Sequence, residues 1–362
     1  NITASQANPD VDSDSALTLS GNLVLSNGDF NLNTGAGNIS VTGTVTSAGT
    51  DESFTATSTG TVTMGAAATS GSVTLRGDSG VSLAGTLATS NTASGAISIT
   101  GPVTLAADIT IDADAHATNT VTFASTATVD ATSSGQQSLT IDTAGGAIAM
   151  QGVIGSTTPL KALTINADGT GTIEVANIGD SNTYGVAGAT AIGNGDTHTL
   201  TLDGTLYKTT GAQTYTADRF AITGTDPAFT TNNANISFVD GATSDIVLAD
   251  AADITFTTGG GDIAIAPQVL GTADNANSDV VLNAGSGTIT LNNAGGAVFT
   301  TDIGAITLTG ATITVSNDIT ADASAIDING ALISDQDTLL EQLEKFEPGD
   351  KIEVTATRNE KI

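Results

Sequence analysis

The stretch that decides the fold is Ala305-Ile306-Thr307-Leu308-Thr309, in which apolar residues alternate with alanine or threonine. Similar strings recur along the chain, such as Ala16-Leu17-Thr18-Leu19-Ser20 and Ala96-Ile97-Ser98-Ile99-Thr100. Successive side chains of an extended strand point to opposite faces, so this alternation predicts short β-strands and not helices. Threonine outside and Val, Ile or Leu inside suit a sheet with one dry face.

The strands recur at a short and regular spacing in the later part of the chain. They begin at Ile236, Ile246, Ile254, Ile263, Val280, Ile289, Ile306, Ile313, Ile319 and Ile326. The recurring step is about eight or nine positions, doubled where a strand is less regular, and such a period is typical of repeat folds. The fold class we predict is therefore all-β: a parallel β-solenoid (β-helix) rod that ends in a short carboxy-terminal helix-strand element.

A sandwich of antiparallel hairpins is the competing architecture. It would need turns such as Asn-Gly at the strand period and a larger aromatic core. Asn-Gly and Asp-Gly pairs do not recur with the strands, and aromatic residues make up only 3% of the chain. A solenoid core of stacked aliphatic rows fits this composition better. With about 17 to 27 residues per coil we expect roughly 12 to 18 coils, about 60–90 Å long at about 4.8 Å per coil.

Composition and charge exclude several classes of protein. The 362 residues carry a formal charge of −30, with 8 Lys and Arg against 38 Asp and Glu, so no basic patch for nucleic acid is expected. No apolar run is long enough to span a membrane. The absence of Cys removes disulfides, thiolate metal sites and cysteine nucleophiles.

The charge divides the chain near residue 334. Residues 1–334 hold four basic and 30 acidic residues, a net charge of −26, whereas residues 335–362 hold four basic and eight acidic residues, a net charge of −4. We therefore expect three segments: a polar leader over 1–15, a β-solenoid over 16–333, and a helix-strand element over 334–362. The leader is expected either to be flexible or to pair with the open edge of an adjacent subunit.

The first residue is Asn1, and no charged-then-apolar leader follows it. This beginning fits an exported protein whose signal peptide has been removed, and an expression product would look the same. We therefore expect an extracellular or cell-surface location.

The repeated strings resemble the repeats of large bacterial adhesins of the filamentous-haemagglutinin kind. The strings that carry the resemblance are Asn38-Ile39-Ser40-Val41-Thr42-Gly43, the run over 155–165, and Gly211-Ala212-Gln213-Thr214-Tyr215-Thr216. The resemblance covers about residues 16–330. It implies a surface location and a role in adhesion or in an extracellular matrix, without catalysis.

The last segment, about residues 325–362, resembles the second half of a PDZ domain of the HtrA protease type. The resemblance rests on Asn329-Gly330, a leucine-rich stretch, Pro348-Gly349-Asp350, an alternating strand and Arg358-Asn359. The half of that domain that carries the carboxylate-binding loop has no counterpart in this chain. Peptide-end binding is therefore not transferred to any residue.

The residues of this segment also predict a helix and a strand. Ser334 or Asp335 can cap a helix, and four apolar side chains would share one of its faces. A helix and strand this short cannot bury that face alone. The element therefore either caps its own chain, joins a neighbouring subunit, or has no role. The candidate assembly residues are Leu339, Leu340, Leu343, Phe346, Ile352 and Val354.

One cluster of polar residues is a candidate metal site. Asp108, Asp112, Asp114 and His116 combine three carboxylates with an imidazole, ligands that suit Ca²⁺ or a transition metal. The alternative is an outer face in contact with water. No cofactor is required by the sequence, and Ca²⁺ is the ion that such a site would take.

Other candidate sites have ordinary structural explanations. Gly259-Gly260-Gly261-Asp262 is similar to one unit of a calcium-binding repeat but occurs once, which favours a turn. A sugar-cleaving groove would need an acid/base pair and aromatic platforms, whereas the chain has no Trp and three scattered Tyr, at 184, 207 and 215. His198 lies between threonines and is expected on the outside. We therefore expect no enzyme activity.

Three functions remain open at this point. The first is a structural subunit of an extracellular bacterial fibre or surface appendage, which joins copies of itself head to tail through open ends. The second is an adhesin fragment that binds a host, a cell or a surface glycan. The third is a β-helix enzyme that acts on polysaccharides.

Overall fold

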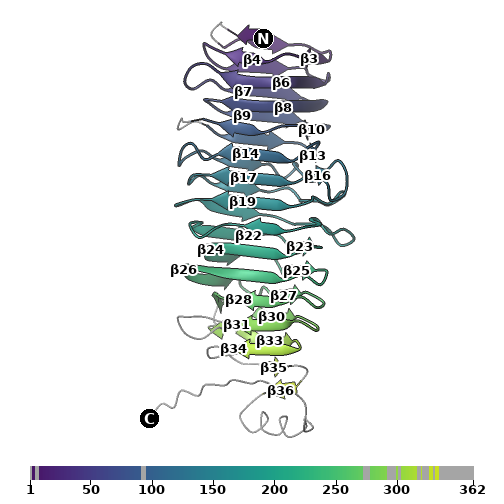
Figure 1. Ribbon diagram of the computed structural model, residues 1–362, viewed down its shortest axis with the longest axis vertical. Helices are drawn as coiled ribbons and strands as arrows, with labels where there is room; N and C mark the ends of the chain where they lie inside the picture. Colours follow the sequence, from purple (N-terminus) through teal and green to yellow (C-terminus); the bar gives the residue numbers. More distant parts are fainter. Residues whose placement is uncertain are drawn as a thin grey trace. The chain divides into compact units, whose positions relative to one another are not determined.

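The computed structural model is an all-β protein in which parallel strands stack into a β-solenoid of about 12 turns (Figure 1). It describes residues 2–4, 8–90, 95–271, 278–291, 299–300, 303–315, 319, 326–328 and 331–333. Every regular element within these ranges is a β-strand, so the described residues include no helix that could span a membrane. The predicted fold class is confirmed, and the number of turns lies at the lower limit of our expectation.

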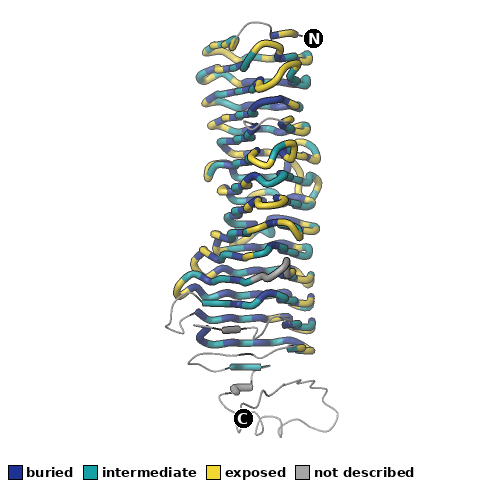
Figure 2. Tube along the Cα trace, turned by 90° about the vertical axis from the view of Figure 1, so that its left-hand side faces the viewer, coloured by how far each residue is buried: buried dark blue, intermediate teal, exposed yellow. Residues whose placement is uncertain are grey.

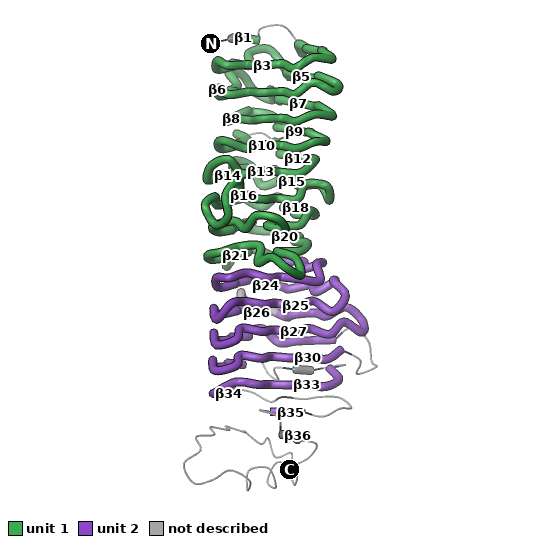
Figure 3. The backbone as a smooth tube through the Cα atoms, turned by 90° about the vertical axis from the view of Figure 1, so that its right-hand side faces the viewer, with its two compact units in different colours: residues 1–198 green, residues 199–362 purple. Residues whose placement is uncertain are grey.

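The described residues fall into two units, Asn1–His198 and Thr199–Ile362, coloured separately in Figure 3. In unit 1 most coils contribute three strands to three parallel ladders, and in the later coils isolated bridges at Ile154 and Ile178 continue the first ladder. The first ladder contains β3 (Leu17–Leu19), the first parts of β6 (Ile39–Ser47) and β8 (Thr61–Thr69), β10 (Gly80–Leu83), β13 (Val103–Leu105) and β16 (Val129–Ala131). The second contains β1 (Ile2–Ala4), β4 (Leu23–Leu25), the later parts of β6 and β8, β11 (Leu87–Thr89), β14 (Ile109–Ala113), β17 (Leu139–Thr143), β19 (Leu163–Ala167) and β21 (Thr190–Ile192). The third contains β2 (Asp10–Asp12), β5 (Phe30–Asn33), β7 (Phe54–Ser58), β9 (Val73–Gly77), β12 (Ile97–Thr100), β15 (Val121–Phe123), β18 (Ile148–Met150) and β20 (Thr172–Val175).

Unit 2 is built in the same way. Its first ladder contains β23 (Leu206–Thr209), β25 (Ala228–Thr231), β27 (Ile254–Thr257), β30 (Ser278–Asn283), β33 (Ile303–Thr309), β35 (Ile326–Ile328) and β36 (Ala331–Ile333). The second contains the first parts of β24 (Gln213–Ile222) and β26 (Ile236–Leu248), with β28 (Ile263–Ile265), β31 (Thr288–Leu291) and β34 (Thr312–Val315). The third contains β22 (Thr199–Leu202), the later parts of β24 and β26, β29 (Gln268–Leu270) and β32 (Phe299–Thr300).

Coil length varies more than the sequence predicts. Phe54 pairs with Val73 in a short coil, whereas Ile111 pairs with Ile141 in a much longer one. The extra residues of the longer coil lie between strands and leave the registers intact. Because pairing fixes only the strands, the coil can lengthen in its connections.

Burial alternates along the strands as the sequence predicts (Figure 2). In β14 the residues Ile109, Ile111 and Ala113 are buried, whereas Thr110 and Asp112 face outward. Each inward residue lies against the equivalent residue of the next coil, as Ile111 does against Ile141. Burying such an aliphatic side chain contributes about 1.5–3 kcal/mol, which makes these rows the main stabilising feature of the coils.

Unit 2 departs from the expected aliphatic core. Tyr207, Phe229 and Phe256 stack in consecutive coils, with ring centroids 4.6 Å and 5.0 Å apart. Tyr215 stacks on Phe238 in the adjacent ladder, with the centroids 4.7 Å apart. All five rings are buried. Two of the tyrosines that look scattered in the sequence therefore belong to one aromatic core.

The polar ends of these tyrosines are satisfied inside the coil. The Tyr207 hydroxyl accepts the Gly204 N–H at 2.9 Å, and the Tyr215 hydroxyl donates to the Gln213 side-chain oxygen at 3.0 Å. The Gln213 side-chain nitrogen donates to the Tyr207 carbonyl and to Thr209 Oγ1. Burial raises the pKa of the Tyr215 hydroxyl well above its usual value. This network lets tyrosine fill the core, because a buried hydroxyl without a partner would be costly.

The strand stack begins earlier than the predicted boundary at residue 16. Strand β1 pairs with β4, and β2 pairs with β5, so parts of the expected leader are strands of the first coil. Ala4 of β1 is buried in this coil. The predicted helix-strand element over 334–362 lies outside the described residues.

One strand pair in unit 2 reverses the direction of the ladder. Strand β35 is parallel to β33 but antiparallel to β36, with Ile326 opposite Ile333. The sequence between the two strands is Asn329-Gly330, the pair that two-residue hairpins prefer. The first ladder therefore has a reversed strand after its last parallel one.

Phe229→Ala should lower the free energy of unfolding by about 3–5 kcal/mol, because it leaves a cavity between two stacked rings. Thr230→Ala, on the outward side of the same strand, should change it by less than about 0.5 kcal/mol. Urea unfolding followed by tyrosine fluorescence and circular dichroism measures both variants. Equal effects of the two substitutions would contradict the role of the aromatic stack.

Candidate functional site

The four predicted metal ligands have different partners in the structure. Asp108 precedes β14, and its Oδ1 accepts the backbone N–H of Ser138 at 2.9 Å. Asp112 lies in β14, and its Oδ1 accepts the N–H of Asp114 at 3.2 Å. The aspartates therefore hold the backbone of their own and the next coil.

The predicted imidazole ligand is engaged within its own loop. His116 Nδ1 lies 3.0 Å from Thr118 Oγ1 and accepts the Thr118 backbone N–H at 3.2 Å. In the part of the chain that the structure describes, no three His, Cys, Asp or Glu side chains gather in a way that could hold a metal ion. The structure thus brings Asp112 and Asp114 together but does not assemble the predicted set of four.

A row of acidic groups does form on the outer face of unit 1. Asp112 pairs in register with Asp142 of the next coil, and Asn166 continues the column. Asp168 follows β19, and its Oδ1 accepts the side-chain amide of Asn194 at 2.6 Å. Two carboxylates thus lie directly above one another, and an amide takes the next position.

Two carboxyls at this row, those of Asp142 and Asp114, have raised pKa values. The pKa of Asp142 is raised by burial first and then by the charges of Asp168 and Asp112. The pKa of Asp114 is raised by its hydrogen bond with Asp112, by burial, and by the same neighbouring charges. Burial, the hydrogen bond between Asp112 and Asp114, and repulsion between the carboxylates together make Asp142 and Asp114 easier to protonate in the folded protein.

The sequence contained a signal for this row. Ile109-Thr110-Ile111-Asp112 and Leu139-Thr140-Ile141-Asp142 are matching strings, and Leu163-Thr164-Ile165-Asn166 is a third. The sequence prediction instead grouped Asp108, Asp114 and His116 with Asp112, because they are close along the chain. A single string does not show how many residues make a coil.

A second set of aspartates and asparagines ties successive coils together. In unit 2 the Asp253 N–H donates to Asp226 Oδ1 at 3.1 Å, and the Asp279 N–H donates to Asp253 Oδ1 at 2.8 Å. The Ala305 N–H then donates to Asp279 Oδ1 at 2.6 Å. These residues form a continuous chain of side-chain-to-backbone bonds across four coils, which we call the corner ladder. Shorter ladders run from Asn235 through Asp262 to Thr288 and from Asn8 through Asp29 to Ser53.

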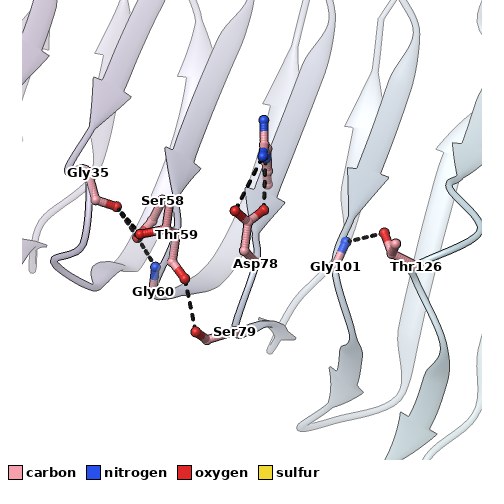
Figure 4. Close-up of polar contacts among 9 residues, drawn as sticks. Gly35, Ser58, Thr59, Gly60, Asp78, Ser79, Gly101 and Thr126 are labelled. Atoms are coloured by element: carbon pink, nitrogen blue, oxygen red, sulfur yellow. Dashed lines mark hydrogen bonds and ion pairs between the residues drawn. The ribbon is translucent and has the colours of Figure 1, made fainter.

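Hydroxyl groups satisfy the backbone at the corners of unit 1 (Figure 4). Ser58 Oγ accepts the Gly60 N–H at 2.8 Å, and Thr59 Oγ1 donates to the Gly35 carbonyl at 2.8 Å. Ser79 Oγ donates to the Thr59 carbonyl at 2.9 Å. The serines and threonines of the sequence therefore perform a local structural role where strands end.

Asp78 and Gly101, both labelled in Figure 4, make two further contacts at these corners. Arg76 Nε lies 2.8 Å from Asp78 Oδ1, and its hydrogen bond lowers the pKa of that carboxyl. The Gly101 N–H donates to Thr126 Oγ1 at 3.3 Å. Because the side chains of Arg76 and Asp78 are exposed, this ion pair contributes little to stability.

The glycine run at 259–261 is a turn, for a steric reason. A Cβ on Gly261 would lie 2.3 Å from the Ala234 backbone carbon of the preceding coil, and Gly259 has a φ of +70°. Thr258 Oγ1 donates to the Gly261 carbonyl within the turn. The glycines allow two coil corners to approach closely. Asp262 accepts the Thr288 N–H, so the run is explained without a bound ion.

The remaining predicted residues are one exposed histidine and a set that lies outside the described residues. His198 is exposed, as expected. The candidate assembly residues Leu339, Leu340, Leu343, Phe346, Ile352 and Val354 lie outside the described residues. Comparison with protein-family models, with curated proteins and with solved structures gave no match to this chain.

Asp253→Ala should lower the free energy of unfolding by about 1 kcal/mol, because the Asp279 N–H loses its acceptor at a partly buried corner. Asp253→Asn keeps an oxygen at that position and should cost clearly less. Urea titration of both variants measures the difference. Equal losses would mean that the carboxylate charge, and not the hydrogen bond, matters at this corner.

Asp142→Asn should stabilise the protein at pH 7 and flatten its pH dependence. The raised pKa values of Asp142 and Asp114 mean that the folded state takes up protons more readily than the unfolded state. The stabilisation that comes from protonating these two carboxyls is therefore complete below the ordinary pKa of Asp, about 3.9. It is lost as the pH rises through their raised pKa values.

Melting temperatures at pH 4, 5, 6 and 7 in low salt test this expectation. Asp12→Asn, which removes the same charge from an exposed position of β2, is the matched control. The expectation is wrong if the melting temperature of the wild type rises no more between pH 7 and pH 5 than the melting temperature of Asp142→Asn does.

Proposed function

We propose that the chain is a structural subunit of an extracellular bacterial fibre or surface appendage, in which copies join head to tail. The observation that carries the proposal is the parallel, in-register stacking of coils, since the strand edge of one coil is the pairing surface for the next. A fold of this kind can be continued by any coil with the same register and a similar apolar row.

The first coil of unit 1 has such an edge. Among the described residues, β1, β2 and β3 each pair on one side only. Leu17 and Leu19 of β3 are partly exposed, whereas Ile39 and Val41 in the next coil of the same ladder are fully buried. This edge is available to a coil of a second copy or to further residues of a longer polypeptide.

A matching aliphatic pair lies in unit 2. Ile313 and Val315 of β34 are partly exposed, whereas Ile289 and Leu291 of the preceding coil are fully buried. Among the described residues, β3 and β34 each pair on one side only, and each presents two branched aliphatic side chains that are separated by one threonine. The equivalent spacing supports β34 of one copy as the partner of β3 in the next.

The proposed surface location rests on the resemblance of the repeats to filamentous-haemagglutinin-like adhesins. The net charge of −30 keeps free copies apart at low salt, where the screening length is about 30 Å at 0.01 M. We therefore expect assembly to be favoured by salt or by millimolar Ca²⁺ acting on the charge as a whole.

Electron microscopy of the purified protein at rising concentration tests the proposal. Long regular fibres are expected, and Leu17→Glu/Leu19→Glu should abolish them by placing charges in the joining row. Thr18→Glu adds a charge on the outward face of the same strand and should leave the fibres intact. Isolated particles at all concentrations, in low salt and in high salt, would overturn head-to-tail assembly.

The same purified protein is used to test the role of the carboxy-terminal segment and the alternative function. Deletion of residues 335–362 should abolish fibres while circular dichroism keeps its β signal, if that segment joins subunits. Unchanged fibres would remove the segment from the mechanism. Isolated particles that bind discrete glycans on an array would favour the adhesin fragment instead.

A further inference from the structure

One outward face of unit 2 differs in chemistry from the other sheet faces. It is formed by the later parts of β24 and β26 together with β29, and we call it the β24–β26–β29 face. Its outward side chains fall into two columns that follow the strand registers. The columns are Arg219, Asp245 and Gln268, and Ala221, Val247 and Leu270.

The second column is apolar although it points away from the core. Phe220, Ile246 and Val269 point inward and are buried, and their neighbours Val247 and Leu270 are partly exposed. Thr201 of β22 precedes this column in register with Ala221. Leu206 and Ala228 form another outward aliphatic pair, in the first ladder, but in the β24–β26–β29 face the apolar column lies beside the opposite charges of Arg219 and Asp245.

The unit 1 row shows how different this face is. There the outward column contains Asp112 and Asp142, whose charges repel any second copy of an acidic chain. In the β24–β26–β29 face the equivalent outward positions carry no net charge, because Arg219 lies in register with Asp245. Arg219 is exposed and is one of four basic residues among the first 334.

We propose that the β24–β26–β29 face packs against the same face of a second copy around a two-fold axis. An axis along the strand direction, between β24 and β26, reverses the order of each column on the partner. Arg219 of each copy then meets Asp245 of the other, and Val247 meets the small Ala221. Charge and size are therefore both self-complementary, as an isologous contact requires.

This contact is lateral and goes beyond head-to-tail joining, because it uses the side of a coil and not its edge. It involves three coils and so belongs to the small and weak class of interfaces, below about 1,200 Å². Self-association should therefore appear at high micromolar concentration and stop at the dimer when fibres are prevented. The electrostatic pairs set the register, and the apolar column supplies the driving force.

Sedimentation equilibrium of the full chain carrying Leu17→Glu/Leu19→Glu separates this contact from fibre growth. In that background Arg219→Glu and Asp245→Arg should each weaken dimerisation about tenfold, because each places like charges opposite one another. The double swap Arg219→Glu/Asp245→Arg should restore it. Failure of the swap to restore dimerisation, with both single variants impaired and folded by circular dichroism, would overturn the proposed two-fold pairing.

Apolar substitutions test the second column. Val247→Glu/Leu270→Glu should abolish the dimer, whereas Val281→Glu, at an outward position of β30 in another ladder, should leave it unchanged. An equal loss in both would show a general effect of added charge and overturn the assignment of the face. A chain that stays monomeric up to millimolar concentration would also overturn it, whatever the outcome of the fibre experiment.

Discussion

Residue-on-residue pairing between coils is the constraint on which the structure depends. Within the parallel ladders, the backbone groups of a strand bond to the neighbouring coils, whose strands lie about 4.8 Å apart, and not to strands of the same coil. Every side chain therefore lies above and below its equivalents. Inside the coil this rule favours columns of similar shape, such as Ile39 followed by Val62, Val81 and Val103. A coil is stable only through its neighbours, as in other repeat proteins.

On the outer face the same stacking of equivalent residues is destabilising where the residues are charged. A carboxylate that is harmless in one coil meets its own kind one coil later, as Asp112 meets Asp142. The chain relieves this repulsion in two ways. It places the amide of Asn166 in the next position, and it directs Asp253 and Asp279 to backbone N–H groups that favour negative charge. The many aspartates thus include some that destabilise the stack and others that stabilise it.

Period-two alternation was enough to predict the fold, because strand strings such as 305–309 specify both conformation and the buried face. It could not predict which strings stack, since the coil that begins at Phe54 is much shorter than the coil that begins at Ile111. The aromatic core was missed for this reason: Tyr207 and Phe229 are neighbours only once the coil is closed. Asp142 was missed as the neighbour of Asp112 for the same reason. The helix-strand element over 334–362 remains a prediction, because it lies outside the described residues.

The variable coil length has a consequence for how such a chain can change. The additional residues of a long coil are accommodated at a corner, and the ladders on either side keep their registers. A corner is thus a place where foreign sequence can be grafted without disturbing the stack, provided that the side-chain acceptor of the next strand, such as Asp108 for Ser138, is preserved. Corners of this kind recur along the stack, so each is a separate insertion point.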